Sequence, residues 1–448
     1  MSVREAKPPY RQSRRMKLQY GFNEIYGWWH LSQGEHREEI QRRLRLMQTK
    51  VVRIFVFDQP MPDPFRDWTS FQVLLQAILD IGAKPMITFA KFPPPYDDRT
   101  NIRNFVSRSS EVVWNCIEHW GGEEVSQWYW CVWNEPNNLI VGGDLSFEQY
   151  LEIYRELSAE ILRQLAPFLG ERKALIGGPA IDGTHRGYWM DWIARLLTDV
   201  DERQVGFVSW HRYGDWRPAV PSETLGLEMW GSPDSPSGQV FQSLLMAQTP
   251  AYEAHARGVS KLLAGHRALN VCGELNTLSH HEYYYTLGYN QNLLGAAYYV
   301  SALIHLIRGG ADLEMRWTAT SHSEAYGLVY RDGKPSPAAL AKQVFVQHVR
   351  TGDNVSFPTH SVCDADLDVV VSRGEGNRIS AVFVNSGRSR VEIFPEDFDP
   401  ELSRCEQLFR LDTSTGERFS AGKASASFTL NGYGVGVITS AGVDTIYE

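Results

Sequence analysis

The chain contains little cysteine and no long apolar run. Its 448 residues include five cysteines, an odd number at wide and irregular spacing, which fits neither a disulfide framework nor a zinc site. No apolar run reaches the roughly 18 residues that a membrane-spanning helix needs, so we expect no membrane partner. The cysteines are Cys116, Cys131, Cys272, Cys363 and Cys405.

The chain also lacks an excess of positive charge. Its 44 Lys and Arg against 53 Asp and Glu give a net charge of −9, so we expect no nucleic-acid partner. No Gly-x-Gly-x-x-Gly opens the first helix, and phosphate-binding loops and Gly-x-Ser-x-Gly elbows are missing, so we expect no cofactor. Aromatic residues are abundant instead, with 14 Trp and 20 Tyr. Such an excess suits a sugar-binding cleft as well as a buried core.

The first 18 residues form a basic segment. Ser13-Arg14-Arg15 is similar to the start of a twin-arginine export signal, but polar residues follow where that signal needs an apolar stretch. We therefore predict a solvated basic tail over 1–18 and a cytoplasmic protein.

Between residues 19 and 350, short β-branched or aromatic runs alternate with longer amphipathic segments, which is typical of βα units. Eight strands with interleaved helices favour a (β/α)8 barrel over 19–350, with a doubly wound open sheet as the alternative. The expected strands are 19–23, 51–57, 85–90, 129–133, 174–179, 205–210, 269–273 and 312–317. The expected helices are 36–48, 68–81, 110–119, 146–165, 187–198, 252–264 and 290–308.

The pattern changes near the C-terminus. Short apolar runs at 369–371, 379–383 and 435–438 are separated by Gly, Asn and Ser turns, without a helical pattern between them. This predicts a small all-β, sandwich-like domain over 351–448, packed beside the barrel.

Three expected connections are unusually long, namely 91–108, 214–251 and 277–289, and each follows a strand. Loops after barrel strands build the catalytic face, so we expect these loops there. Trp216 and Trp230 in the longest loop indicate a wall or lid over the site, although a surface decoration is the alternative. The adjacent histidines of 280–282 (His-His-Glu) have no convincing third ligand, so we expect hydrogen bonds to sugar hydroxyls there and no metal.

The strongest local signals are two glutamates at expected strand ends. Residues 133–137 (Trp-Asn-Glu-Pro-Asn) follow the fourth strand, and residues 272–276 (Cys-Gly-Glu-Leu-Asn) follow the seventh. These strands lie on opposite sides of a barrel mouth, so Glu135 and Glu274 can face each other across a cleft. Two facing carboxylates are the machinery of glycoside hydrolysis.

Residues 133–137 resemble the acid/base motif of the retaining glycoside hydrolases of clan A. The wider pattern resembles glycoside hydrolase family 39, which includes β-xylosidases and α-L-iduronidases. The resemblance covers roughly residues 20–345 and rests also on Arg53 and on residues 177–180 (Gly-Gly-Pro-Ala), 209–213 (Ser-Trp-His-Arg-Tyr), 274–277 (Glu-Leu-Asn-Thr), 326–329 (Tyr-Gly-Leu-Val) and 332–335 (Asp-Gly-Lys-Pro). It implies a (β/α)8 barrel in which Glu135 is the acid/base and Glu274 the nucleophile.

The two glutamates need different protonation states. Glu135 has to be protonated at rest, so burial and the charge of the second carboxylate should raise its pKa. Glu274 has to stay ionised, which Arg53 and a hydrogen bond from Tyr213 would favour.

Three further residues complete the expected site. Asn134 can bind the sugar 2-hydroxyl. His211 either holds a hydroxyl, orients Glu135 or is a packing histidine, and Trp317 is either a platform beneath the sugar or part of the core. Two residues depart from the family pattern: Leu275 stands where an aromatic residue is usual, and Arg212 adds a charge that can recognise a substrate carboxylate or pair with an acid elsewhere.

The resulting hypothesis is a retaining, exo-acting, β-xylosidase-like hydrolase that uses a glycosyl–Glu274 intermediate. An endo-acting polysaccharide hydrolase is the alternative within the same clan, and a non-catalytic carbohydrate-binding barrel is the alternative from another class. The expected partner is an oligosaccharide or polysaccharide, and an oligomer is possible.

Overall fold

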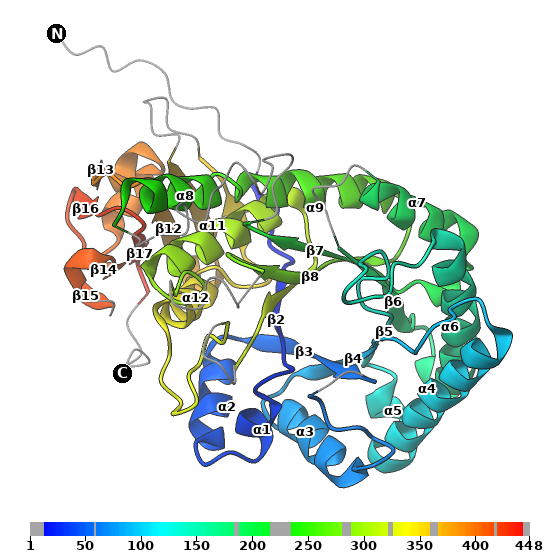
Figure 1. Cartoon of the computed structure of the whole chain (residues 1–448). Coiled ribbons are helices and arrows are strands. Elements are labelled where there is room, and N and C mark those ends of the chain that lie inside the picture. Colours follow the sequence, from blue (N-terminus) through cyan, green and yellow to red (C-terminus); the bar gives the residue numbers. More distant parts are fainter. Residues whose placement is uncertain are drawn as a thin grey trace.

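The computed structural model describes residues 13–57, 60–182, 188–215, 234–279, 288–320, 326–358, 366–415 and 419–441. Eight parallel strands close into a barrel, which confirms the expected (β/α)8 architecture and excludes the open sheet (Figure 1). The barrel strands are β2 (Gln19–Asn23), β3 (Thr49–Val56), β4 (Lys84–Phe89), β5 (Tyr129–Val132), β6 (Leu175–Ile181), β7 (Phe207–Tyr213), β8 (Leu269–Asn276) and β9 (Leu313–Trp317). They are almost wholly buried because helices cover their outer faces.

Helices surround this barrel, and most begin with a side-chain cap. The side chain of Ser146, for example, accepts a hydrogen bond from the backbone N–H of Gln149. The side chain of Gln149 accepts one from the backbone N–H of Ser146, and this pair fixes the start of the longest helix. The helices are α1 (Trp28–Ser32), α2 (Arg37–Leu46), α3 (Trp68–Asp80), α4 (Arg99–Trp120), α5 (Gly122–Val125), α6 (Phe147–Leu169), α7 (Trp189–Asp199), α8 (Pro236–Met246), α9 (Pro250–Leu262), α11 (Leu293–Gly309) and α12 (Pro337–His348).

Two of the expected long loops contain helices. The connection 91–108 ends at Asp98, whose carboxylate accepts from the N–H groups of Thr100 and Asn101 and so starts α4 eleven residues before the expected helix. In the connection 214–251, Ser235 caps α8, which has a proline in its first turn. Figure 1 places α8 over the C-terminal sheet rather than over the barrel mouth. Trp216 and Trp230 lie outside the described residues.

The C-terminal part is all-β, as expected, and its strands pair in an antiparallel way. A seven-stranded sheet has the order β1-β10-β11-β12-β17-β14-β15, and β13 pairs with β16 in a separate ribbon. The strands are β1 (Arg14–Arg15), β10 (Asn354–Ser356), β11 (Leu367–Arg373), β12 (Ile379–Asn385), β13 (Val391–Ile393), β14 (Gln407–Leu411), β15 (Ser420–Lys423), β16 (Phe428–Leu430) and β17 (Val435–Thr439).

The edge strand β1 comes from the basic N-terminal segment. Arg14 and Arg15 pair with β10, and Met16 and Leu18 are buried. The expected solvated tail is therefore wrong for this stretch, because Met16 and Leu18 anchor it to the core while the backbone completes a sheet. Residues 1–12 lie outside the described part of the chain.

The sheet buries both of its faces. Alternate residues such as Val370, Val382 and Val384 join the core that α11 and α12 share with the barrel, whereas Val371 and Phe383 belong to a second cluster. That cluster includes the β13–β16 ribbon, which gives the sandwich-like second layer. No helix in the described ranges combines the length and apolarity that a membrane crossing requires.

Candidate active site

The first half of the site lies on two neighbouring barrel strands. β7 and β8 each run three residues beyond their expected ends, and His211 lies beside Glu274 in their register. The side chains of His211, Tyr213 and Glu274 are thus fixed by strands rather than by loops. The hydroxyl of Tyr213 donates to Glu274 Oε2 at 2.7 Å.

Arg53 on β3 holds the carboxylate of Glu274 from the other side. This fully buried guanidinium donates to Glu274 Oε1 at 2.8 Å and to Asn134 Oδ1 at 2.7 Å. Its remaining hydrogen bonds go to Thr88 Oγ1 at 2.8 Å and Asn23 Oδ1 at 3.2 Å. Because its partners come from four other segments, Arg53 ties the two halves of the site together.

The second half of the site follows β5. Glu135 has a φ of 47°, a left-handed conformation that is rare for a residue with a side chain. Its backbone N–H donates to the carbonyl of Ala180 at 2.9 Å, which fixes the segment against the end of β6. Asn138 Nδ2 donates to Glu135 Oε2 at 3.1 Å and to Asp182 Oδ2 at 2.9 Å, so one amide group bridges two carboxylates.

The surroundings of the two glutamates give them different acidities. Burial and the nearby charge of Asp182 raise the pKa of Glu135 well above its usual value. Burial also raises the pKa of Glu274, but Arg53 and Tyr213 oppose that rise. The expected direction for Glu135 is found, with Asp182 as the main charged cause in place of Glu274.

His211 links the two carboxylates as a neutral group. Its Nδ1 lies 2.7 Å from Glu135 Oε1 and 3.5 Å from Glu274 Oε1. Burial, together with the charge of Arg53, lowers the pKa of His211 to about 3. The contact of His211 with Glu135 agrees with one of its three expected roles, the orientation of Glu135. Because His211 is neutral, the positive charge near Glu274 is that of Arg53.

One carboxylate oxygen of each glutamate and a ring nitrogen of His211 lie within 4.8 Å of one another. Retaining glycosidases hold their carboxyl groups about 5–5.5 Å apart, and inverting enzymes about 6.5–9.5 Å. The same three residues are the one group in the described chain whose donor atoms are close enough to hold a metal ion.

The other expected residues lie near this network. Arg53 fixes the amide of Asn134 through its oxygen, which leaves the NH2 group as a donor. Trp317 ends β9, and its ring meets that of Phe55 edge-on at 5.8 Å. A hydrogen bond from Asn276 to the carbonyl of Trp317 connects it to the strand that carries Glu274.

Strand alternation removes two residues from the site. Leu275 is buried in the core, and Arg212 points outward, where it donates to Gln248 at 2.9 Å. Recognition of a substrate carboxylate by Arg212 is therefore excluded by its position. His280, His281 and Glu282 lie outside the described residues.

The sequence reasoning missed four polar residues of the network. Asn23 and Thr88 bind Arg53, and Asn138 and Asp182 surround Glu135. Asn138 follows Glu135 by three residues, and Asp182 follows the end of the fifth barrel strand, β6. The position of Asp182 at a barrel-strand end was the available signal.

The chain resembles known glycosidases in sequence and in fold. The model of glycosyl hydrolases family 39 matches residues 14–231, a little under half of the chain. A β-xylosidase of Geobacillus stearothermophilus is 29% identical over 174 residues, which cover 35% of this chain and 32% of that protein. The aligned part of the chain therefore spans about a third of that relative's length.

Solved structures of glycosidases share the fold of this chain. A monomeric β-xylosidase from Caulobacter crescentus CB15 has a TM-score of 0.60 at 16% identity, with 98% of each chain covered. A family 51 α-L-arabinofuranosidase from Bifidobacterium longum has a TM-score of 0.67 at 12% identity, with 97% of each chain covered. At these identities the comparisons support the barrel with its β domain, and the chemistry has to be argued from the site.

Proposed function

We propose that this protein is a retaining, exo-acting β-glycosidase of the β-xylosidase type. The observation that carries the proposal is a pair of buried glutamates. A carboxylate oxygen of Glu135 lies within 4.8 Å of one of Glu274, and the surroundings favour protonation of the first residue and ionisation of the second. Arg53 and Tyr213 hold Glu274, while burial beside Asp182 favours the protonated form of Glu135. The family match and the name of the Geobacillus relative favour a β-xyloside as the substrate.

In the first step, the carboxylate of Glu274 attacks the anomeric carbon and forms an ester bond to the sugar. The glycosidic C–O bond breaks, and the proton of Glu135 moves to the leaving oxygen. In this proposal the NH2 group of Asn134 binds the sugar 2-hydroxyl as charge develops on the ring.

In the second step, Glu135 takes a proton from water, and the water oxygen attacks the anomeric carbon. The ester bond breaks, the carboxylate of Glu274 is restored, and Glu135 again carries a proton. Two inversions give net retention. Between steps His211 stays neutral and holds Glu135 in place.

The test is a panel of aryl β-glycosides (xyloside, glucoside, galactoside and arabinoside) with the wild type, Glu274→Ala and Glu135→Ala. We expect turnover of the xyloside to fall by several orders of magnitude in both variants and to return with added azide. The azide product distinguishes the roles: Glu274→Ala should give the α-glycosyl azide, and Glu135→Ala the β-glycosyl azide.

Each of the other outcomes rejects part of the proposal. Identical azide products from both variants would exclude these roles. Turnover of polysaccharide but of no aryl glycoside would favour the endo-acting alternative, and oligosaccharide binding without turnover would favour the non-catalytic barrel.

A further inference from the structure

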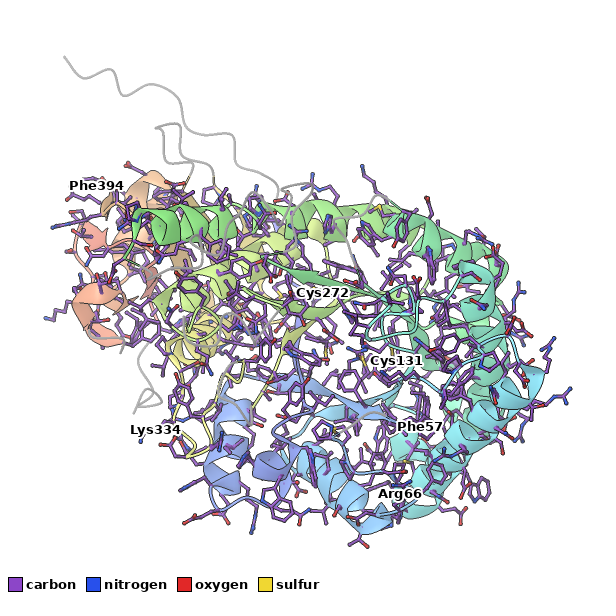
Figure 2. All side chains as sticks on the ribbon, viewed as in Figure 1. Phe57, Arg66, Cys131, Cys272, Lys334 and Phe394 are labelled. Carbon is purple, nitrogen blue, oxygen red and sulfur yellow. The ribbon has the colours of Figure 1, made fainter. Side chains whose placement is uncertain are left out.

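A cavity lies beside the barrel mouth. It has a volume of about 460 Å³ and is formed by the loops after β3 and β4 and by the first turns of α4. Phe57 and Arg66 mark it on the side of the barrel that α3 and α4 cover (Figure 2). A volume of this size is in the range of small-molecule sites.

The cavity lies on the side of the site from which a leaving group departs. β4 and β8 are four strands apart in the eight-stranded barrel, so this cavity and Glu274 lie on opposite sides of the mouth. The ring of Phe92 in the cavity wall meets that of Trp133 at 5.2 Å, and Trp133 directly precedes Asn134 and Glu135. A chain that extends from the sugar past the acid/base glutamate is therefore directed toward the cavity.

Two cations line this cavity without an acidic partner among the residues that the structure describes. Arg108 stacks over the rings of Phe65 and Phe57 at 4.5 and 4.9 Å. Lys91 donates to the carbonyl of Val141 at 2.9 Å. Neither has an ion pair within the described ranges, whereas the third cation of the wall, Arg66, lies 3.6 Å from a carboxylate oxygen of Asp63.

The lining therefore combines two properties. The aromatic rings of Phe57 and Phe92 offer an apolar surface for the face of a sugar ring, and the amide of Asn101 can bind hydroxyl groups. The charges of Lys91 and Arg108, which have no ion pair among the described residues, suit a carboxylate. A uronic acid is a ligand that has both a sugar ring and a carboxylate.

We propose that this cavity binds an acidic sugar unit on the leaving-group part of the substrate. The inference rests on the proposed glycosidase function, because that function makes Glu135 the group that faces the leaving oxygen. It predicts a preference for oligosaccharides that carry a carboxylate over neutral ones of the same length.

The test compares two substrates, xylotriose and the same trisaccharide with a glucuronic acid on its reducing-end unit. We expect the wild type to have a KM about tenfold lower for the acidic substrate, as one charge-assisted contact allows. Arg108→Gln and Lys91→Gln should each remove most of this difference. Arg103→Gln is the matched control, because Arg103 is an exposed arginine of the same helix outside the cavity.

Aryl β-xylosides separate this inference from the proposed function. Their small leaving group does not reach the cavity, so Arg108→Gln should hydrolyse them like the wild type. If aryl xylosides are hydrolysed but the acidic preference is absent, or is the same in Arg108→Gln, the cavity proposal is wrong and the function stands.

Calorimetry tests whether the cavity binds acidic sugars even if the protein hydrolyses no glycoside. Titration of both trisaccharides into Glu274→Gln measures binding without turnover, and the acidic compound should bind more tightly. If that preference is found while no glycoside is hydrolysed, the cavity binds acidic sugars and the proposed function is wrong. Equal affinities for the two trisaccharides would overturn the cavity proposal.

Discussion

Replacing Arg53 with methionine should disable the site through Glu274 and Asn134. The buried guanidinium donates charge-assisted hydrogen bonds to Glu274 and Asn134. Such bonds contribute about 1.5–3 kcal/mol each. Losing both corresponds to a decrease in kcat/KM of about 10²- to 10⁴-fold.

The same substitution should shift the pH profile in a defined direction. In the proposed mechanism, activity requires ionised Glu274, which sets the acidic limb, and protonated Glu135, which sets the alkaline limb. The positive charge of Arg53 lowers the pKa of both groups. Its removal should therefore move both limbs of kcat/KM to higher pH.

The assay is hydrolysis of an aryl β-xyloside between about pH 4 and 9, with Arg53→Lys as the control. Lysine keeps the positive charge but lacks the planar guanidinium that binds Glu274 and Asn134 together. The pH profile of Arg53→Lys should therefore stay near that of the wild type although its rate falls. Breaking a buried ion pair also costs about 3–5 kcal/mol of the free energy of unfolding, so thermal melts must show that each variant is folded. A folded Arg53→Met enzyme with an unshifted acidic limb would refute the reasoning.

Three more predictions concern single hydrogen bonds and charges. Tyr213→Phe removes the hydroxyl that donates to Glu274, so kcat/KM should fall about 10- to 100-fold and the acidic limb should move to higher pH; an unchanged rate would contradict this. Asp182→Asn removes a charge that raises the pKa of Glu135, so the alkaline limb should move to lower pH, and an upward shift would exclude that role. His305 lies between carboxylates of α9 and β11; burial lowers its pKa, but these partners outweigh burial and raise it above 6.5. The stabilisation by His305 is then complete below about pH 6.5 and lost as the pH rises through the raised pKa, so melting temperatures of the wild type and His305→Asn should converge at alkaline pH.

The barrel could be predicted because its strands are buried on both faces. Such strands form continuous apolar runs, and the run at 51–57 marks β3 to within two residues at its start and one at its end. The ends of β7 and β8 were harder, since polar side chains that face the mouth interrupt the apolar run. His211 and Glu274 are such polar residues, and because of them the predicted strands ended too early.

The residues around the site were predicted where their chemistry is tied to a motif. Arg53 and Tyr213 lie where the expected roles require them. The sequence allowed Arg212 to be a recognition residue because the expected strand ends at 210. Beyond that end, the alternation of side chains between the two faces of a strand gives no direction for Arg212. Asn138 and Asp182 were missed because loop amides and carboxylates are common, and only the fold brings these two together beside Glu135.

The central claim is a covalent intermediate on Glu274. The most direct measurement is mass spectrometry of peptides after incubation with an activated 2-deoxy-2-fluoro-β-xyloside, whose fluorine slows the second step more than departure of a good leaving group. The account predicts one added fluoroxylosyl group on the peptide that contains Glu274, and none in Glu274→Ala. A label on another residue, or substrate turnover that releases the α-anomer first, would contradict it.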